Sequence, residues 1–427
     1  MKTLPVLLIS AFPAFARLRR GRQLFLWLAV VSYVGGSFSA FGQGSLTPPG
    51  PPAPTMKKLD ELEPRTNLQA TLAPAGVDTS NPTYHFIINQ PGSYYLSANL
   101  VVTKTNGIQI NAEGVTLDLN GFQISRVSPD GNGIEISNVG HRATIRNGTV
   151  IGFVSGINGG VAKGCAFRDL AVTGCTSYGI RAANGAILEF CRASGTSGTA
   201  GIATGWGSTL SNCTATNNVV TVGISAGSSS SLTNCSASLN SGAFGINASS
   251  GSSLTNCTAS FNTGIVPVSA GISADYGSTL THCTAYFNDS DVSQTSTTGM
   301  GVYLNSGGTI QNSTVQFNSG DGIRAGSECL IRENNSVYNG AGVHSTGSNN
   351  RIEGNNVVGN GRGINVDATG NLIIKNSAKS NTIDYAIAAS NRYGPIVDIS
   401  AAGAPAVNGK SATDTTGTSH PWANFSY

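Results

Sequence analysis

The strongest constraint on this chain is a short sequence unit that repeats about every 22 residues. Each copy opens on a Gly-Ile or Gly-Val step, and a second signal follows, as in TLSNCTA (209–215), SLTNCSA (231–237) and SLTNCTA (253–259). Helical hairpin repeats are longer and poor in glycine, and leucine-rich repeats need several leucines per unit. Ala386-Ile387 is a degenerate thirteenth copy, and the twelve clear steps begin at Gly107, Gly133, Gly156, Gly179, Gly201, Gly223, Gly245, Gly271, Gly301, Gly322, Gly342 and Gly363.

Short runs of alternating apolar and polar residues lie between clusters of Gly, Asn and Ser in each unit. This pattern predicts short strands joined by tight turns. A unit of this length suits three strands, each pairing in parallel with its equivalent in the next coil, so that the stack buries one continuous core. We therefore predict an all-β fold over residues 67–399, a single-stranded parallel β-helix (β-solenoid) of about 12 to 13 coils and about 55–60 Å in length.

Two of the predicted inward columns are nearly uniform in residue type. The leucine column comprises Leu210, Leu232, Leu254 and Leu280. The cysteine column also holds Leu170 and comprises Cys191, Cys213, Cys235, Cys257 and Cys283. Cysteines in a secreted chain ordinarily predict disulfides, but parallel stacked side chains disfavour the disulfide torsion. We expect a buried cysteine ladder of free thiols, with some pairing as the alternative. The chain has no CxxC or HxxxH spacing, so no metal site is predicted from its Cys or His residues.

Charge is scarce and unevenly placed. Only 11% of the residues are charged, and residues 1–42 hold five basic residues and no acidic one. Without them, 19 basic residues face 21 acidic ones, which leaves a net charge of −2. This balance argues against nucleic acid as a partner and against anchoring on an anionic membrane surface.

The first 42 residues have the order of a secretory signal peptide. Arg19, Arg20 and Arg22 precede the apolar run Leu24–Val34, and small residues follow it. We expect cleavage after Gly42, with an uncleaved anchor as the alternative, although the apolar run is too short to span a bilayer stably. No second long apolar segment follows, so the mature chain is expected to be extracytoplasmic and to have no membrane span.

The flanks of the repeat differ from it in composition. Residues 43–66 contain LTPPGPPAPT and KKLDELEPR, and we expect a Pro-rich linker followed by a short charged segment. Residues 400–427 form a tail rich in Ala, Gly, Thr and Ser that closes on PWANFSY (421–427). Because uncapped solenoid ends expose strand edges, we expect PWANFSY to fold back as a cap.

The repeat pattern resembles the right-handed parallel β-helix superfamily, which has the pectate-lyase-like fold. QPGSYYLSANL (90–100) and GVTLDLNGFQI (114–124) resemble the first coils of secreted bacterial right-handed β-helix repeat proteins, and residues 46–66 and PWANFSY resemble flanks in the same group. The resemblance implies a right-handed solenoid but no single activity, because this superfamily includes lyases, hydrolases, epimerases, tailspikes and adhesins. The Asn-Thr-Asp, Asp-Asp, Gly-His-Gly and Arg-Ile-Lys motifs of polygalacturonases are absent, so no catalytic residue is assigned.

Polar side chains suited to a binding site return in coils nine to twelve. Residues 193–320 contain no Lys, Arg or Glu, and their carboxylates are Asp275, Asp289 and Asp291. The residue two after each Gly should point outward, and this position together with its neighbours predicts a carbohydrate-binding patch of Tyr303, Asp321, Arg324, His344, Arg362, Asn365 and Asp367. Arg and Asn bind sugar hydroxyls or carboxylates, Tyr stacks on sugar rings, and His or Asp can carry a proton. A solvated face is the alternative for this patch, and a Ca²⁺ ion at Asp289 and Asp291 is an open possibility.

These observations predict a secreted β-helix protein that binds extracellular polysaccharide or cell-surface glycan, or displays itself on it, without clear catalytic motifs. The alternative is a polysaccharide lyase, hydrolase or epimerase that acts on uronides through the patch on coils nine to twelve. No cofactor is predicted.

Overall fold

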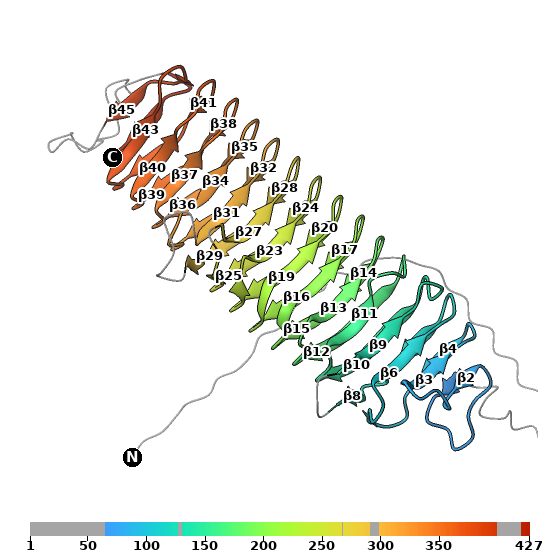
Figure 1. The fold of residues 1–427 in the computed structure, drawn as a ribbon. Coiled ribbons are helices and arrows are strands. Elements are labelled where there is room, and N and C mark those ends of the chain that lie inside the picture. Colours follow the sequence, from blue (N-terminus) through green and yellow to red (C-terminus); the bar gives the residue numbers. More distant parts are fainter. Residues whose placement is uncertain (1–64, 127–129, 267, 291–298, 399–419) are drawn as a thin grey trace, which may run out of the picture. The chain divides into compact units, whose positions relative to one another are not determined.

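The computed structural model describes residues 65–126, 130–266, 268–290, 299–398 and 420–427. All of them belong to one compact unit, Lys58–Tyr427. The predicted signal peptide, the linker, Asp291 and most of the tail lie outside the described residues. The described part is an all-β parallel solenoid of about 14 turns (Figure 1), which confirms the predicted fold class. None of the described residues forms a helix, so none forms an apolar helix long enough to cross a membrane.

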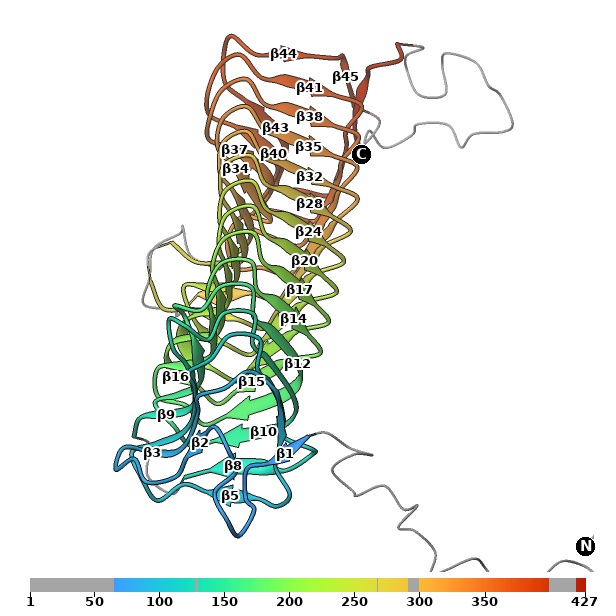
Figure 2. The ribbon, with the colours of Figure 1, turned by 90° about the vertical axis from the view of Figure 1, so that its right-hand side faces the viewer.

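Each turn contributes strands to three faces, and equivalent strands of successive turns pair in parallel (Figure 2). One turn consists of β13 (Tyr178–Ala182) on the first face, β14 (Ile187–Glu189) on the second and β15 (Arg192–Ser194) on the third. The first face, which carries the candidate site, comprises β3 (Tyr84–Ile88), β6 (Asn106–Ile110), β9 (Asn132–Ile136), β11 (Ser155–Gly159), β13, β16 (Ser197–Thr204), β19 (Val219–Ala226), β23 (Phe244–Ala248), β27 (Ala270–Ala274), β31 (Met300–Leu304), β34 (Ile323–Ala325), β37 (Ala341–Ser345), β40 (Arg362–Val366) and β43 (Ile383–Ile387).

The turn count exceeds the predicted 12 to 13 because the first turn lacks the Gly step and is not counted among the repeats. Strand β3 has the sequence YHFII, and it nevertheless pairs in register with β6. At the other end, Tyr385 lies opposite Ile364 and Ala386 lies opposite Asn365. The thirteenth copy is therefore Asp384-Tyr385, and the expectation that it begins at Ala386 was wrong by two residues.

The Gly steps mark the place where successive turns approach most closely. A Cβ atom on Gly223 would lie 2.6 Å from the carbonyl oxygen of Gly245 in the next turn and 2.8 Å from the side-chain nitrogen of Asn240. No larger residue fits there without a shift of the backbone. The following Ile224 is fully buried, and Ser225 then faces outward, which sets the in-and-out alternation of the first face.

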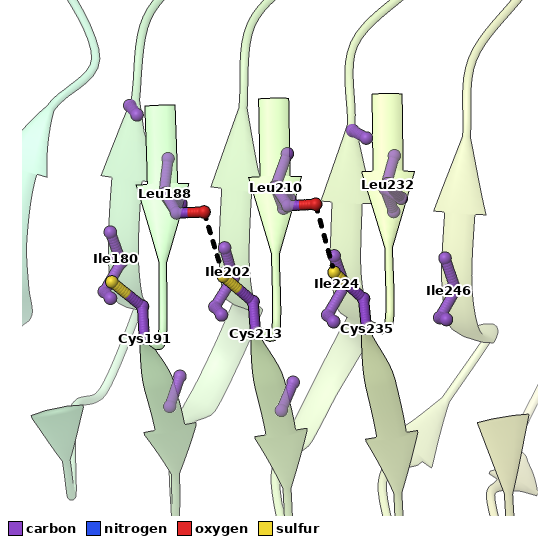
Figure 3. Packing of buried hydrophobic residues seen from close by; sticks show 14 of the residues in the cluster. Ile180, Leu188, Cys191, Ile202, Leu210, Cys213, Ile224, Leu232, Cys235 and Ile246 are labelled. Carbon is purple, nitrogen blue, oxygen red and sulfur yellow. Dashed lines mark hydrogen bonds between the residues drawn. The ribbon is translucent and has the colours of Figure 1, made fainter. Parts of the chain in front are cut away.

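Like residues stack in the core from turn to turn. Leu210 lies opposite Leu188 and Leu232 in the strand pairing, and Cys191, Cys213 and Cys235 occupy one position in three successive turns (Figure 3). The Sγ atoms of Cys213 and Cys235 lie 3.5 Å from the carbonyl oxygens of Leu188 and Leu210, respectively. All eight cysteines of the chain are buried free thiols.

A ladder of buried asparagines follows the turn between the third and first faces. The Nδ2 atom of Asn288 donates to the carbonyl oxygen of Ala259 at 3.0 Å and to Oδ1 of Asn318 at 2.9 Å. The backbone nitrogen of Asn288 donates to the same Oδ1 atom at 3.0 Å. The amides thus satisfy backbone groups that the sharp turn leaves unpaired. The ladder comprises Asn218, Asn240, Asn262, Asn288, Asn318, Asn339 and Asn360.

The C-terminal segment adds a strand to the last turns of the stack. Strand β46 (Asn424–Ser426) pairs in parallel with β42 (Ser377–Lys379) on one side and with β45 (Ile396–Asp398) on the other. It therefore takes the position of a further third-face strand, although 25 residues separate it from β45. Tyr385 holds the segment in place, because its hydroxyl lies 2.9 Å from the carbonyl oxygens of both Asn376 and Phe425 and can donate to either of them.

Candidate functional site

The strand register places the predicted outward residues in one column on the first face. Ser273, Tyr303, Arg324, His344 and Asn365 lie directly opposite one another in β27, β31, β34, β37 and β40. Their strands lie side by side toward the C-terminal end of the solenoid (Figure 1). Because the Gly and Ile or Val before each of them are buried, the alternation of the strand directs these side chains away from the core.

A surface cavity of about 620 Å³ lies beside this column, where the chain enters the first face. Four successive turns line it, from the residues before β34 to the start of β43. Five of the seven predicted site residues line the cavity: Asp321, Arg324, His344, Arg362 and Asn365. Its lining also includes residues that the sequence did not indicate, among them Ser319, Thr382 and Ile383.

His344 is held between two carboxylates from the neighbouring turns. Its Nδ1 atom lies 2.7 Å from Oδ2 of Asp321, and its Nε2 atom lies 2.7 Å from Oδ2 of Asp367. The His344 and Asp321 side chains are about 15% exposed, whereas that of Asp367 is 56% exposed. Asn365, which is buried, donates to the other oxygen of Asp367 at 3.2 Å.

This arrangement favours the charged form of His344. Burial lowers the pKa of His344, but the hydrogen bonds and charges of Asp321 and Asp367 outweigh burial and raise its pKa above the usual value. The hydrogen bond from His344 likewise lowers the pKa of Asp367, against a smaller opposing effect of burial. An imidazolium has two N–H donors, so it satisfies both carboxylates at once.

The cavity has an excess of positive charge when His344 is protonated. Arg324 places Nη1 3.6 Å from Oδ2 of Asp321, and the charge of Arg362 contributes to the low pKa of Asp367. Two guanidinium groups and one imidazolium thus face two carboxylates, which leaves a net charge of +1. The first face therefore presents two arginines, together with His344 and its two carboxylate partners, to a ligand. This arrangement suits anionic groups.

Two of the predicted site residues do not line the cavity. Asp367 reaches it through its contact with His344. Tyr303 lies on the preceding turn, opposite Arg324. Ile383, which the sequence did not indicate, lies opposite Arg362 in the strand pairing. Alignment of the last repeat copy at Asp384-Tyr385 places Thr382 and Ile383 just before its Gly position, and this offset is the sequence signal that predicts them as cavity residues.

The described residues contain no group of three or more His, Cys, Asp and Glu side chains able to hold a metal ion. Asp289 lies in β30 (Asp289–Ser290), but Asp291 is outside the described residues. The Ca²⁺ site at these two residues stays a prediction.

Comparison with known proteins finds one matching family model and several solved structures of similar fold. The family model described as "Right handed beta helix region" matches residues 155–308 and 298–400. No curated protein sequence matches the chain. Among solved structures, the A-module of the mannuronan C-5 epimerase AlgE4 from Azotobacter vinelandii is 18% identical with a TM-score of 0.47, over 71% of this chain and 91% of that chain.

Two further solved structures are similar at lower scores. A mutant of the periplasmic alginate epimerase AlgG is 13% identical with a TM-score of 0.38, over 77% of this chain and 81% of that chain. The pectate lyase Pel9A is 16% identical with a TM-score of 0.35, over 65% of this chain and 74% of that chain.

Proposed function

This chain belongs to the right-handed β-helix family, and we propose that it binds an acidic extracellular polysaccharide in the cavity on its first face. The observation that carries the proposal is the excess of positive charge there, with Arg324 and Arg362 beside the His344 network. Guanidinium groups bind carboxylates through paired hydrogen bonds. A sugar chain with uronate groups supplies such carboxylates at regular intervals.

The shape of the cavity supports a linear ligand. Four turns line it, which corresponds to about 15 Å along the solenoid axis. Tyr303 extends the same outward column by one turn, where an aromatic ring can pack against a sugar ring. A polymer that follows the axis would contact the arginines and then Tyr303.

The hydrogen bonding of His344 favours binding over catalysis. Both ring nitrogens already contact carboxylates at 2.7 Å. A general acid or base needs a nitrogen within hydrogen-bond reach of the substrate. His344 can transfer a proton to a ligand only after one aspartate has moved away.

One observation supports a second candidate, a lyase, hydrolase or epimerase that acts on uronides. The Asp367 side chain is 56% exposed, so an incoming substrate can displace it and gain access to Nε2 of His344. The raised pKa keeps a proton on the ring, as a general acid requires.

Affinity measurements with charged and neutral glycans test the binding proposal. Pectate, alginate and a glycosaminoglycan should bind the purified protein, and neutral dextran should not. Arg324→Gln and Arg362→Gln should each weaken binding about tenfold or more. Arg332→Gln is the matched control, because Arg332 lies on the second face of the turn that holds Arg324. Equal losses in all three variants would contradict the proposal.

Assays on the same glycans separate binding from catalysis. With and without added Ca²⁺, lyase activity appears as absorbance of unsaturated uronides, hydrolysis as new reducing ends, and epimerisation as a changed ¹H NMR spectrum of the polymer. Binding without any product supports the first candidate. Turnover that His344→Gln abolishes would replace it with the second.

We also propose that the protein is exported by the segment 1–42. The basic cluster and the apolar run Leu24–Val34 support this. N-terminal sequencing of exported protein should find Gln43 first. An N-terminus at Met1 in the membrane fraction would indicate an uncleaved anchor.

A further inference from the structure

A row of exposed aromatic rings follows the turn between the third and first faces. It consists of Phe261, Phe287, Phe317 and Tyr338, which we call the aromatic ridge. The ring centroids of successive members are 5.4, 6.3 and 5.1 Å apart, and successive ring planes are 29°, 32° and 22° from parallel. The four residues are 46%, 46%, 40% and 56% exposed. The ridge is thus a continuous apolar surface across four turns.

The turn itself does not require rings at these positions. All four ridge residues have positive φ, between 52° and 55°, which bulky side chains rarely adopt. Asn217 and Gly359 hold the same turn position in other turns, with φ of 55° and 66°. Asn and Gly accept this backbone conformation at lower cost, so the backbone geometry of the turn does not account for the rings.

The rings are arranged for an apolar partner rather than for sugar stacking. Neighbouring rings cover one another's faces, and Tyr286 packs edge-on against Phe261 and Phe317. These contacts cover part of each ring face, whereas a sugar ring packs on an open aromatic face. Trp206 and Tyr276 lie elsewhere on the surface, 68% and 57% exposed, with no ring stacked on them in the described part of the chain.

The surroundings of the ridge carry almost no charge. Residues 193–320, which include three of the four rings, contain no Lys, Arg or Glu, and the carboxylate nearest to the ridge in this stretch is Asp289, two residues after Phe287. The outward neighbours on the third face, such as Thr284 and Thr314, are hydroxyl residues. A partner can cover this surface without burying an unpaired cation. Charge does not attract a partner here, so the partner has to be neutral and apolar as well.

A second copy of the chain meets these requirements. The exposed parts of the four rings amount to roughly 400 Å², about half of what each side of a standard interface buries. The rings repeat once per turn, and a surface with the same axial repeat is presented by another copy of this solenoid. We propose that two copies associate side by side through their aromatic ridges, about a twofold axis.

Sedimentation equilibrium of the purified protein tests this association. We expect a dimer at micromolar concentration. The double variant Phe287→Asn with Phe317→Asn should raise the dimer dissociation constant about tenfold or more. Asn is chosen because Asn217 holds the equivalent turn position, and thermal unfolding of the double variant confirms that it still folds. Added salt should not weaken the dimer, because the four ridge side chains carry no charge.

The matched control is Trp206→Asn with Tyr276→Asn, which removes two exposed rings outside the ridge. It should leave the dimer intact. A wild-type protein that stays monomeric throughout the micromolar range would overturn the proposal. So would equal dissociation of the ridge and control variants, or a monomer that binds neutral glucan through the ridge.

Discussion

The side-chain oxygen of Asn424 accepts two hydrogen bonds from Asn376, one from its backbone nitrogen at 3.0 Å and one from its Nδ2 atom at 3.2 Å. Asn355 is bonded to Asn376 in the same way. Asn334 is bonded to Asn355 in this way as well, so Asn424 extends a second asparagine ladder, which follows the turn between the second and third faces. The C-terminal strand β46 is thus joined to the preceding turn by the same kind of bonds that join the turns to one another.

Removal of the Asn424 side-chain amide should destabilise the last turns of the solenoid. Asn424→Ala removes the acceptor for two donors of the buried Asn376, so we expect unfolding to cost about 1–3 kcal/mol less. Hydrogen exchange should accelerate in β42 and β46. Trp422→Ala is the control, since its side chain is 55% exposed, and it should leave exchange in β42 unchanged. Equal acceleration in both variants would show that Asn424 has no specific role.

Substitution of an asparagine in the ladder between the third and first faces should destabilise the protein more than substitution of an exposed asparagine. Asn262 donates through Nδ2 to Ala237 and Asn288 and accepts from Asn240. Asn262→Ala therefore leaves buried polar groups in two adjacent turns without hydrogen-bond partners. Its free energy of unfolding should fall by about 2–3 kcal/mol in urea titrations. Asn356→Ala, which breaks one exposed bond to Asn335, should cost far less. Similar losses in the two variants would refute this account of the ladder.

The repeat made the fold and the register of the candidate site predictable. In-register parallel coils place residues with the same offset from the Gly step opposite one another, and this brings Arg324, His344 and Asn365 into one column. The contacts of Asp321 and Asp367 with His344 depend on which rotamers fit between the turns. A sequence pattern fixes the position of a side chain on a strand but not its rotamer, so the paired carboxylates emerged only with the structure.

The sequence also carries weaker signals for the last turn of the solenoid and for the residues that connect the third face to the first. Asp384-Tyr385 replaces a Gly-Ile step, and the pairing of backbone strands tolerates this replacement because the last turn has no complete neighbour on its outer side. The Phe-Asn pairs at 261–262, 287–288 and 317–318 recur at one position of the repeat. Apolar residues at positive φ contradict local propensity, so the pattern indicates neither the ridge nor the ladder without the observed turn.

The eight cysteines should be unreactive in the folded protein and all free after unfolding. All eight side chains are at most 2% exposed, so a reagent cannot reach them. Burial also raises the pKa of Cys175 to about 11, and the thiolate is the reactive form. A thiol reagent at pH 8 should therefore label almost nothing in native protein and all eight thiols in denaturant without reductant. Labelling with reductant added after unfolding is the control. Fewer than eight thiols without reductant, restored to eight with it, would reveal disulfides.

The His344 network should make stability depend on pH in a direction that its pKa fixes. The folded-state pKa of His344 is raised above 6.5, so the native state binds the proton more tightly than the unfolded chain. The stabilisation is fully present below pH 6.5 and is lost as pH rises through the higher folded-state pKa. His344→Gln should reduce the free energy of unfolding by about 1.5–3 kcal/mol at pH 6 and flatten its decline toward pH 9. Urea titrations across this range measure both effects, and His282→Gln, an exposed histidine outside the cavity, should keep the wild-type slope. A wild-type stability that rises from pH 6 to 9, or the same slope in His344→Gln, would show that the two aspartates do not hold the imidazolium.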